Sequence, residues 1–207
     1  RRRLRLQTLR SHCMVCTALA LRNSATLSFM DTRYDMHCHL GFVPDPVAVA
    51  EAGAAGGIRA FSCTVEPVEY DRLQPLLAPV PSVAVGLGAH PWWIADGRVG
   101  ATALDAFCAL APTTRFIGEI GLDFAGARDT AESRALQVAA FERILAACDA
   151  TPAASPSEND VDSPANAGNP VPGENQTGKL ISIHAVQTAE TVLDLLEATG
   201  TSKRHRC

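Results

Sequence analysis

Short apolar segments alternate with longer segments of helical periodicity from residue 34 onward. Strand-like patterns cover residues 34–40, 58–65, 82–88, 115–120 and 180–184. A helical pattern follows each strand, and a typical helix start has Asp45 as N-cap and Pro46 in the first position. The strongest helical pattern covers residues 129–150, and its apolar face consists of Leu136, Ala140, Phe141, Ile144, Leu145 and Cys148. Five strand–helix units in succession predict an α/β fold with a parallel sheet covered by helices.

Two segments depart from this rhythm. Residues 1–30 contain six arginines and no acid, and we interpret them as a non-native extension, with a mitochondrial transit peptide as the alternative. Residues 151–178 hold five of the 13 prolines and no basic residue, Leu, Ile or aromatic residue. This composition predicts a flexible surface insertion. We therefore expect one domain over residues 31–207, interrupted by the insertion at 151–178.

The composition excludes several classes of protein. Hydrophobic residues make up 47% of the 207 residues and charged residues 19%, which excludes a disordered, collagen-like or coiled-coil chain. No run approaches the roughly 18 apolar residues that a membrane-spanning helix needs. Seven cysteines at irregular spacing do not look like a disulfide framework, so we expect a reducing, cytoplasmic location.

Charge separates the first 30 residues from the rest of the chain. The chain carries −4 overall, so the 177 residues after the arginine-rich start carry −10. An acidic body argues against binding of nucleic acid by bulk charge. Any nucleic-acid chemistry must therefore come from a local site.

Candidate chemistry begins at the end of the first predicted strand. Asp35, His37 and His39 alternate along it, so their side chains are expected on the same side. Two imidazoles at this spacing can bind one divalent metal ion. A pair of histidines lining a polar rim is an equally good interpretation of this motif alone.

The fourth predicted strand contains a carboxylate, Glu119, in an apolar run between Gly118 and Gly121. A carboxylate in such a run needs compensation, which a metal ion or a buried arginine can provide. The two glycines allow the backbone to be approached closely on either side of Glu119.

Further ligand-type residues end the third and fifth predicted strands. His184 ends the fifth strand, so the first, fourth and fifth strands each bring a candidate ligand to the end of a parallel sheet that typically holds an active site. After the third strand, His90 can orient a substrate or donate a hydrogen bond to a phosphate. The adjacent Trp92 and Trp93 can stack on a base or pack at the rim.

Taken in order, the motifs DMHCHL, GAHPWW, GEIGLD and ISIH resemble the TatD family of metal-dependent deoxyribonucleases. Gln137 and Phe141 add a weaker match in the helix after GEIGLD. The resemblance covers residues 34–200 apart from the insertion. It implies a (β/α)₈ TIM barrel of the metallo-dependent hydrolase type, of which this chain contains about five strand–helix units.

The resemblance also implies a site and a reaction. By this resemblance, His37 and His39 would bind a first metal ion, Glu119 would bridge two ions and His184 would bind the second. His90 and Asp123 would position the substrate. The cofactor is a divalent cation, Mg, Zn or Mn, and imidazole ligands favour zinc or manganese. The substrate is DNA, whose phosphodiester bonds are hydrolysed.

The chain departs from the family pattern at several points. Val186 stands where the family usually has an arginine, and the sixth-strand histidine and eighth-strand aspartate of the family have no counterpart before Cys207. We therefore expect a truncated barrel with at most one bound metal ion and weak or absent phosphodiesterase activity. Open sheet edges at 34–40 and 180–184 predict self-association. The alternatives are a non-catalytic remnant with residual metal binding and a barrel hydrolase that acts on a small amide or ester.

Overall fold

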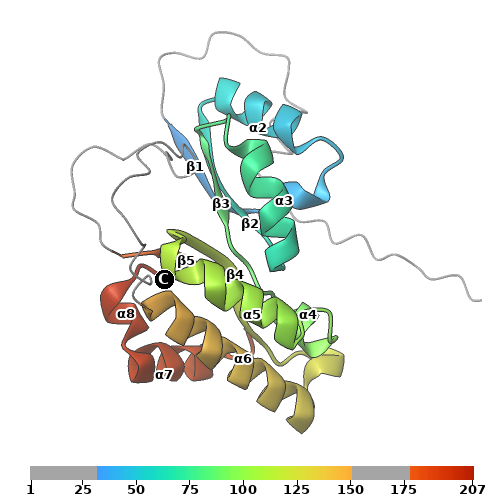
Figure 1. The fold of residues 1–207 in the computed structure, drawn as a ribbon, viewed down its shortest axis with the longest axis vertical. Coiled ribbons are helices and arrows are strands. Elements are labelled where there is room, and N and C mark those ends of the chain that lie inside the picture. Colours follow the sequence, from blue (N-terminus) through green and yellow to red (C-terminus); the bar gives the residue numbers. More distant parts are fainter. Residues whose placement is uncertain (1–31, 151–177) are drawn as a thin grey trace, which may run out of the picture.

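The computed structural model describes residues 32–150 and 178–207 (Figure 1). Five parallel strands lie in this part of the chain: β1 (Arg33–Cys38), β2 (Ile58–Cys63), β3 (Val83–Gly86), β4 (Phe116–Asp123) and β5 (Leu180–Val186). Each corresponds to a strand that the sequence pattern predicts. The predicted extension 1–30 and the predicted insertion, apart from Gly178, lie outside the described residues.

Helices follow the strands as the alternation predicts. The longer ones are α2 (Pro46–Ala55), α3 (Pro67–Leu77), α5 (Ala101–Leu110), α6 (Ala131–Asp149) and α7 (Ala189–Thr199). The predicted start of α2 is confirmed, because the Asp45 side chain accepts a hydrogen bond from the backbone N–H of Ala48 at 3.0 Å. The sequence pattern missed the short helices α4 (Pro91–Ala95) and α8 (Thr201–Arg204) and the 3-10 turns η1 (Leu40–Phe42), η2 (Ala111–Thr113) and η3 (Gly126–Arg128). None of the helices described is both long and apolar enough to cross a membrane.

The strands form two sheets instead of the single sheet that the alternation predicts. β1, β2 and β3 pair in that order, and β4 pairs with β5. The sheets meet just beyond β3, where Leu87 and Ile117 form an isolated parallel bridge. β3 itself ends at Gly86, and the chain after it stays bonded to β4, since the backbone N–H of Ala89 donates to the carbonyl oxygen of Glu119 at 3.0 Å. In Figure 1, β1–β3 with α2 and α3 occupy the upper half, and β4–β5 with α5, α6, α7 and α8 the lower half.

Thr64 joins the two sheets at the level of the candidate site. It follows β2, and its backbone N–H donates to the carbonyl oxygen of Gly118 at 2.9 Å. Its own carbonyl oxygen accepts from the N–H of Glu119 at 2.9 Å, and its hydroxyl donates to the Gly86 carbonyl at 2.8 Å. Thr64 therefore fixes the backbone around Glu119 relative to β2 and β3.

Two apolar clusters form the core, one around β4 and α6 and one beneath α2 and α3. On α6, the residues of the predicted apolar face that are buried are Ala140, Phe141, Ile144, Leu145 and Cys148. The prediction for Leu136 is wrong, because its side chain is 48% exposed. The neighbouring Gln137 takes the buried position at that turn of the helix and is fully buried.

The outer strands β1 and β5 differ in whether another segment pairs with their outer edges. Within the described residues, β1 pairs with β2 alone, and Tyr34 and Met36 on β1 are 60% and 50% exposed. The start of β5 is covered, because the chain turns back after α8 and Arg206 forms a parallel bridge with Leu180. The expectation of an open edge along all of residues 180–184 is therefore wrong at its first residue.

Candidate metal centre

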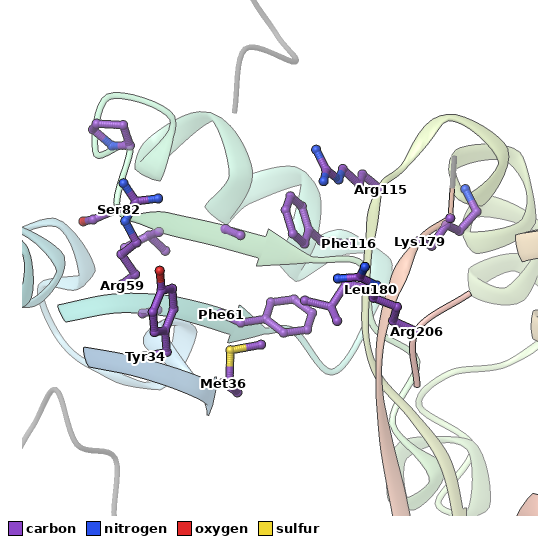
Figure 2. A pocket seen from close by; sticks show the side chains of 15 residues that line it. Tyr34, Met36, Arg59, Phe61, Ser82, Arg115, Phe116, Lys179, Leu180 and Arg206 are labelled. Carbon is purple, nitrogen blue, oxygen red and sulfur yellow. The ribbon is translucent and has the colours of Figure 1, made fainter. Parts of the chain in front are cut away.

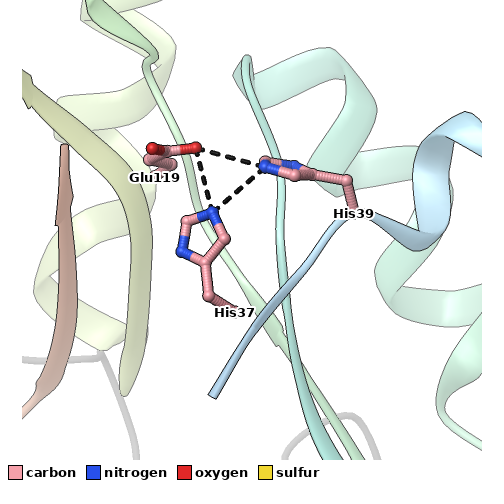
Figure 3. Close-up of side chains that lie close together, drawn as sticks. All are labelled: His37, His39 and Glu119. Carbon is pink, nitrogen blue, oxygen red and sulfur yellow. Dashed lines mark hydrogen bonds and ion pairs between the residues drawn. The ribbon is translucent and has the colours of Figure 1, made fainter. Parts of the chain in front are cut away.

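The carboxylate of Glu119 in β4 lies where four histidine side chains converge. Glu119 is 6% exposed. The Nε2 atoms of His37 and His39 each lie 3.2 Å from its Oε2 atom, and Nε2 of His90 lies 3.4 Å from the same oxygen. The Nδ1 atom of His184 lies 2.7 Å from Oε1. Figure 3 shows His37 and His39 from the N-terminal sheet facing Glu119 across the junction of the two sheets.

These contacts distinguish the two interpretations of a carboxylate in an apolar strand. The ion-pair partners of Glu119 are imidazoles rather than a buried arginine. Burial opposes its ionisation, but hydrogen bonds from the four imidazoles outweigh burial and hold the pKa of the Glu119 carboxyl well below its ordinary value. The strand therefore presents an anion, with its two oxygens in different surroundings.

The Nδ1 atoms of His37 and His39 are both held by other groups, so their Nε2 atoms face Glu119. Nδ1 of His39 donates to the backbone carbonyl of Cys63 at 3.0 Å. Nδ1 of His37 lies 2.9 Å from the Ser182 hydroxyl oxygen, and the two Nε2 atoms are 3.2 Å apart. A neutral imidazole whose Nδ1–H is bonded in this way carries its lone pair on Nε2, which is the form that binds a metal ion.

Protons occupy part of this site when no cation does. Hydrogen bonds with Cys63 and with Glu119 raise the pKa of His37 to about 10. Burial acts to lower the pKa of His184, but hydrogen bonds to Glu119 and Asp123 outweigh it and raise that pKa. A cation that binds here must therefore displace protons, as is general for histidine ligands.

His90 differs from His37 and His39 in which ring nitrogen carries the proton. Its Nδ1 atom accepts a hydrogen bond from the backbone N–H of Trp92 at 3.1 Å, at the start of α4. Burial lowers the pKa of His90, so the ring is neutral at neutral pH. In that neutral tautomer Nε2 carries the proton, and His90 acts as a donor toward Glu119 and not as a metal ligand.

Asp35 does not join the cluster, although the alternation predicts it on the side of His37 and His39. Its carboxylate is buried and accepts a hydrogen bond from the backbone N–H of His37 at 3.2 Å. The strict alternation fails because the pairing of β1 with β2 shifts register between Asp35 and Cys38. His39 lies beyond the end of β1.

Asp123 and His184 form the second part of the cluster. Asp123 at the end of β4 is 2% exposed, and its Oδ2 atom lies 2.9 Å from Nε2 of His184. The indole N–H of Trp92 donates to the same oxygen. Burial opposes ionisation of Asp123, but these hydrogen bonds lower the pKa of its carboxyl. The chain of contacts from Trp92 through Asp123 and His184 ends at Oε1 of Glu119.

The two glycines beside Glu119 allow close approach, as predicted. At Gly121, with φ +137°, a Cβ atom would lie 2.1 Å from the carbonyl oxygen of His184. At Gly118, with φ +157°, it would lie 2.8 Å from Cβ of Ser182. Both positions therefore require glycine for β5 to lie beside β4 at the site.

The donor set fits a divalent metal ion at one of two groups of side chains. His37, His39 and Glu119 form one group, and His90, Glu119 and His184 form the other, each with its ligand atoms within 4.8 Å of one another. Two imidazoles and a carboxylate are a known ligand set for zinc. The first group has both imidazoles oriented by second hydrogen bonds, whereas the second contains His90 as a donor.

Two contributors to the site escaped the sequence analysis. Ser182 and Cys63 hold the Nδ1 atoms of His37 and His39 through the hydroxyl and the backbone carbonyl described above. Ser182 stands two residues before His184, so the period of a strand is a signal that could have placed both on one face. Cys63 acts on His39 through its backbone carbonyl, for which the sequence carries no signal, and its Sγ atom lies 3.7 Å from Nδ1 of His37.

Val186 contributes no cation to the rim of the site, but an arginine lies close by. Val186 ends β5 and is 38% exposed. The guanidinium of Arg128 in η3 stacks 4.4 Å from the ring centroid of Trp92, whose indole N–H contacts Asp123. Among the described residues, Nε of Arg128 is buried without a hydrogen-bond partner, and the same atom lies 3.9 Å from an Asp96 oxygen.

The chain is similar in sequence and in structure to proteins of one family. Residues 34–153, more than half of the chain, match the family described as TatD related DNase. The comparison with curated proteins found no significant match.

A solved structure shares the fold. The chain superposes on the crystal structure of YjjV, a TatD homologue from Escherichia coli K12, with a TM-score of 0.60 and 17% sequence identity. The match covers 83% of this chain and 57% of that one, so this chain spans little more than half the length of YjjV. The parallel α/β architecture is thus part of a TIM barrel of the metallo-dependent hydrolase type. With the sequence match over residues 34–153, this shows that the chain belongs to the family of TatD-related DNases.

Proposed function

We propose that this chain is a divalent-metal-dependent hydrolase that cleaves phosphodiester bonds of DNA. The observation that carries the proposal is the convergence of His37, His39 and Glu119, whose ligand atoms lie within 4.8 Å of one another. Membership of the TatD-related DNases supports the reaction class.

We propose that His37, His39 and Glu119 hold one divalent ion, and that zinc or manganese is preferred over magnesium because two of the three ligands are imidazoles. When bound, such an ion lowers the pKa of a coordinated water and neutralises charge on a phosphate oxygen. A second ion would have only Glu119 and His184 as described ligands, because His90 acts as a donor. We therefore propose a single ion.

In this proposal, His184 and Asp123 position the carboxylate of Glu119. Nδ1 of His184 engages Oε1 of Glu119, which leaves Oε2 directed at His37 and His39. Asp123 holds the other nitrogen of His184 and is itself held by Trp92. Without these contacts the Glu119 carboxylate would be free to rotate away from the two imidazoles.

Substrate contacts come from the rim of the site. His90 presents an N–H toward Glu119, where it can donate to a phosphate oxygen. Arg128, stacked on Trp92, supplies the cationic group that Val186 does not. Local cations of this kind are needed because the chain as a whole is acidic, with a net charge of −4.

The experiment that tests the proposal is a cleavage assay on a labelled DNA oligonucleotide. The protein is first stripped with EDTA and then supplied with zinc, manganese or magnesium, and a small amide and a small ester are offered in parallel. We expect weak metal-dependent DNA cleavage, because a single ion is proposed, and we expect the double variant His37→Ala, His39→Ala to lose it. His205→Gln, a histidine change outside the cluster, should retain it.

Three results would contradict the proposal. They are no DNA cleavage with any of the metal ions, cleavage that survives in the double variant, and a clear preference for the amide or ester. A folded double variant, checked by circular dichroism, is needed for the comparison.

A further inference from the structure

A second site lies at the opposite ends of the strands from Glu119. A cavity of about 420 Å³ opens between the two sheets, beside the amino-terminal halves of their strands. Its lining includes Tyr34, Arg59, Phe61, Arg115, Phe116 and Arg206. Figure 2 shows Arg59 beside Tyr34 at one end, and Arg115 and Arg206 near Phe116 and Leu180 at the other. The cavity is within the range of volumes that small-molecule sites occupy, about 300–1,000 Å³.

Positive charge is concentrated at this end of the molecule. A basic residue lies within one position of the first residue of four of the strands: Arg33, Arg59, Arg115 and Lys179. The residues that line the cavity include no Asp or Glu, although the whole chain has a net charge of −4. An acidic chain that gathers cations around one cavity creates a local field that attracts anions.

Arg59 and Arg115 are available to such an anion. Both are exposed, and neither takes part in an ion pair with any residue in the described part of the chain. Lys179 is different, because its ammonium group donates to the backbone carbonyls of Ala111, Pro112 and Thr114 at 2.8–3.1 Å. Lys179 is therefore engaged by the protein itself, whereas Arg59 and Arg115 are available to bind an anion.

Flat and apolar side chains lie between these cations. Tyr34 and Met36 line the cavity and are 60% and 50% exposed. The rings of Phe61 and Phe116 lie 5.8 Å apart with an interplanar angle of 54°, and Arg115 lies 5.6 Å from the Phe116 centroid. Aromatic faces beside guanidinium groups are the surroundings in which nucleobases stack and phosphates bind.

We propose that this cavity binds a nucleoside monophosphate, with the phosphate on Arg59 or Arg115 and the base against Tyr34 and Met36. A fatty acid or another apolar anion has no flat ring to stack on the aromatic side chains of the cavity. Inorganic phosphate alone would bind an arginine but would make no contact with those side chains. The site needs neither the metal centre nor the hydrolytic reaction, since none of its residues contacts Glu119 or the four histidines.

The test is calorimetric titration of the 207-residue chain with deoxyadenosine monophosphate in the presence of EDTA. The double variant Arg59→Ala, Arg115→Ala should raise the Kd at least about tenfold, as expected for loss of charged hydrogen bonds to a phosphate. The matched control is Arg98→Ala with Arg143→Ala, which removes two exposed arginines elsewhere and should leave the Kd within about twofold.

Further arms of the titration separate the contributions. Tyr34→Ala should raise the Kd of the nucleotide several-fold but leave the weaker binding of inorganic phosphate unchanged. The metal-site variant His37→Ala, His39→Ala should bind the nucleotide as the wild type does. Equal affinity for phosphate and nucleotide, an unchanged Kd in the arginine double variant, or loss of binding in the metal-site variant would each overturn the proposal. If the chain does not cleave DNA, the proposal of nucleotide binding in the cavity is unaffected. The two proposals can therefore be disproved independently.

Discussion

The side-chain amide of Gln137 hydrogen-bonds both backbone groups of Asp123. Its Oε1 atom accepts from the N–H of Asp123 at 2.8 Å, and its Nε2 atom donates to the Asp123 carbonyl oxygen at 3.0 Å. Gln137 lies fully buried on α6. This pairing attaches the end of β4, where Asp123 holds His184, to the helix that covers the sheet.

Gln137→Met keeps the volume of the side chain but leaves both backbone groups of Asp123 unpaired in the core. We expect the free energy of unfolding to fall by about 1–3 kcal/mol, measured by urea denaturation. Leu136→Met, at the exposed neighbouring position on α6, should leave it unchanged. Equal stability of the two variants would show that the pairing contributes nothing to folding.

Arg128→Ala removes the guanidinium that stacks on Trp92. If Arg128 contacts the phosphate of the substrate, KM for an oligonucleotide should rise about tenfold with a smaller change in kcat. Arg98→Ala is the matched control, because Arg98 stacks on the adjacent Trp93 at 4.1 Å. A similar KM in both variants would remove Arg128 from the proposed substrate contacts.

Asp149 at the end of α6 attaches the C-terminal turn to the core. Its carboxylate accepts hydrogen bonds from Arg204 and Thr201 and contacts His205. The hydrogen bond from Arg204, against the effect of burial, lowers the pKa of Asp149. A lowered pKa in the folded state adds stability above the unfolded pKa of about 3.9, and this stability is lost as the pH falls through the folded pKa.

Asp149→Asn should therefore lower the melting temperature by about 4 °C at neutral pH, and the difference from wild type should shrink as the pH falls below about 3.9 and vanish below the folded pKa of Asp149. Asp105→Asn removes the exposed partner of Arg143 and should have little effect at any pH. Melting curves by circular dichroism across this range make the comparison. A difference that is the same at both ends of the range would exclude the ion pair as its cause.

Self-association through β1 is the prediction that follows from the sheet edges. Among the described strands β1 pairs with β2 alone, and Tyr34 and Met36 on it are exposed. Met36→Lys should reduce association measured by sedimentation velocity, because a charge on an edge strand opposes pairing. Val68→Lys, at an exposed apolar position on α3, should not. A wild type that stays monomeric at every concentration would contradict the prediction.

Much of the fold and of the site could be predicted because the signals are local. Alternating apolar patterns located all five strands, and Asp45 and Pro46 located the start of α2. His37 and His39 were found from their alternate spacing at the end of the first strand. Glu119 was found because a carboxylate in an apolar strand is expensive without a partner, and His184 because it ends the fifth strand. The structure brings them to one point because parallel strands end at the same side of the sheet.

Other features depend on contacts between distant residues. The register shift in β1 that separates Asp35 from His37 arises from its pairing with β2. The donor character of His90 depends on the backbone of Trp92 at the start of a short helix that the pattern missed. Leu136 is exposed because Gln137 takes the buried position. No local pattern carries these facts.

The central claim is a single metal site formed by His37, His39 and Glu119. Calorimetric titration of the EDTA-stripped protein with zinc tests it most directly, with the double variant His37→Ala, His39→Ala and the single variant His90→Ala beside the wild type. We predict one zinc ion per wild-type chain, none for the double variant, and one for His90→Ala, because His90 faces Glu119 as a donor. Two tight zinc sites in the wild type, or zinc binding that the double variant retains, would contradict the account.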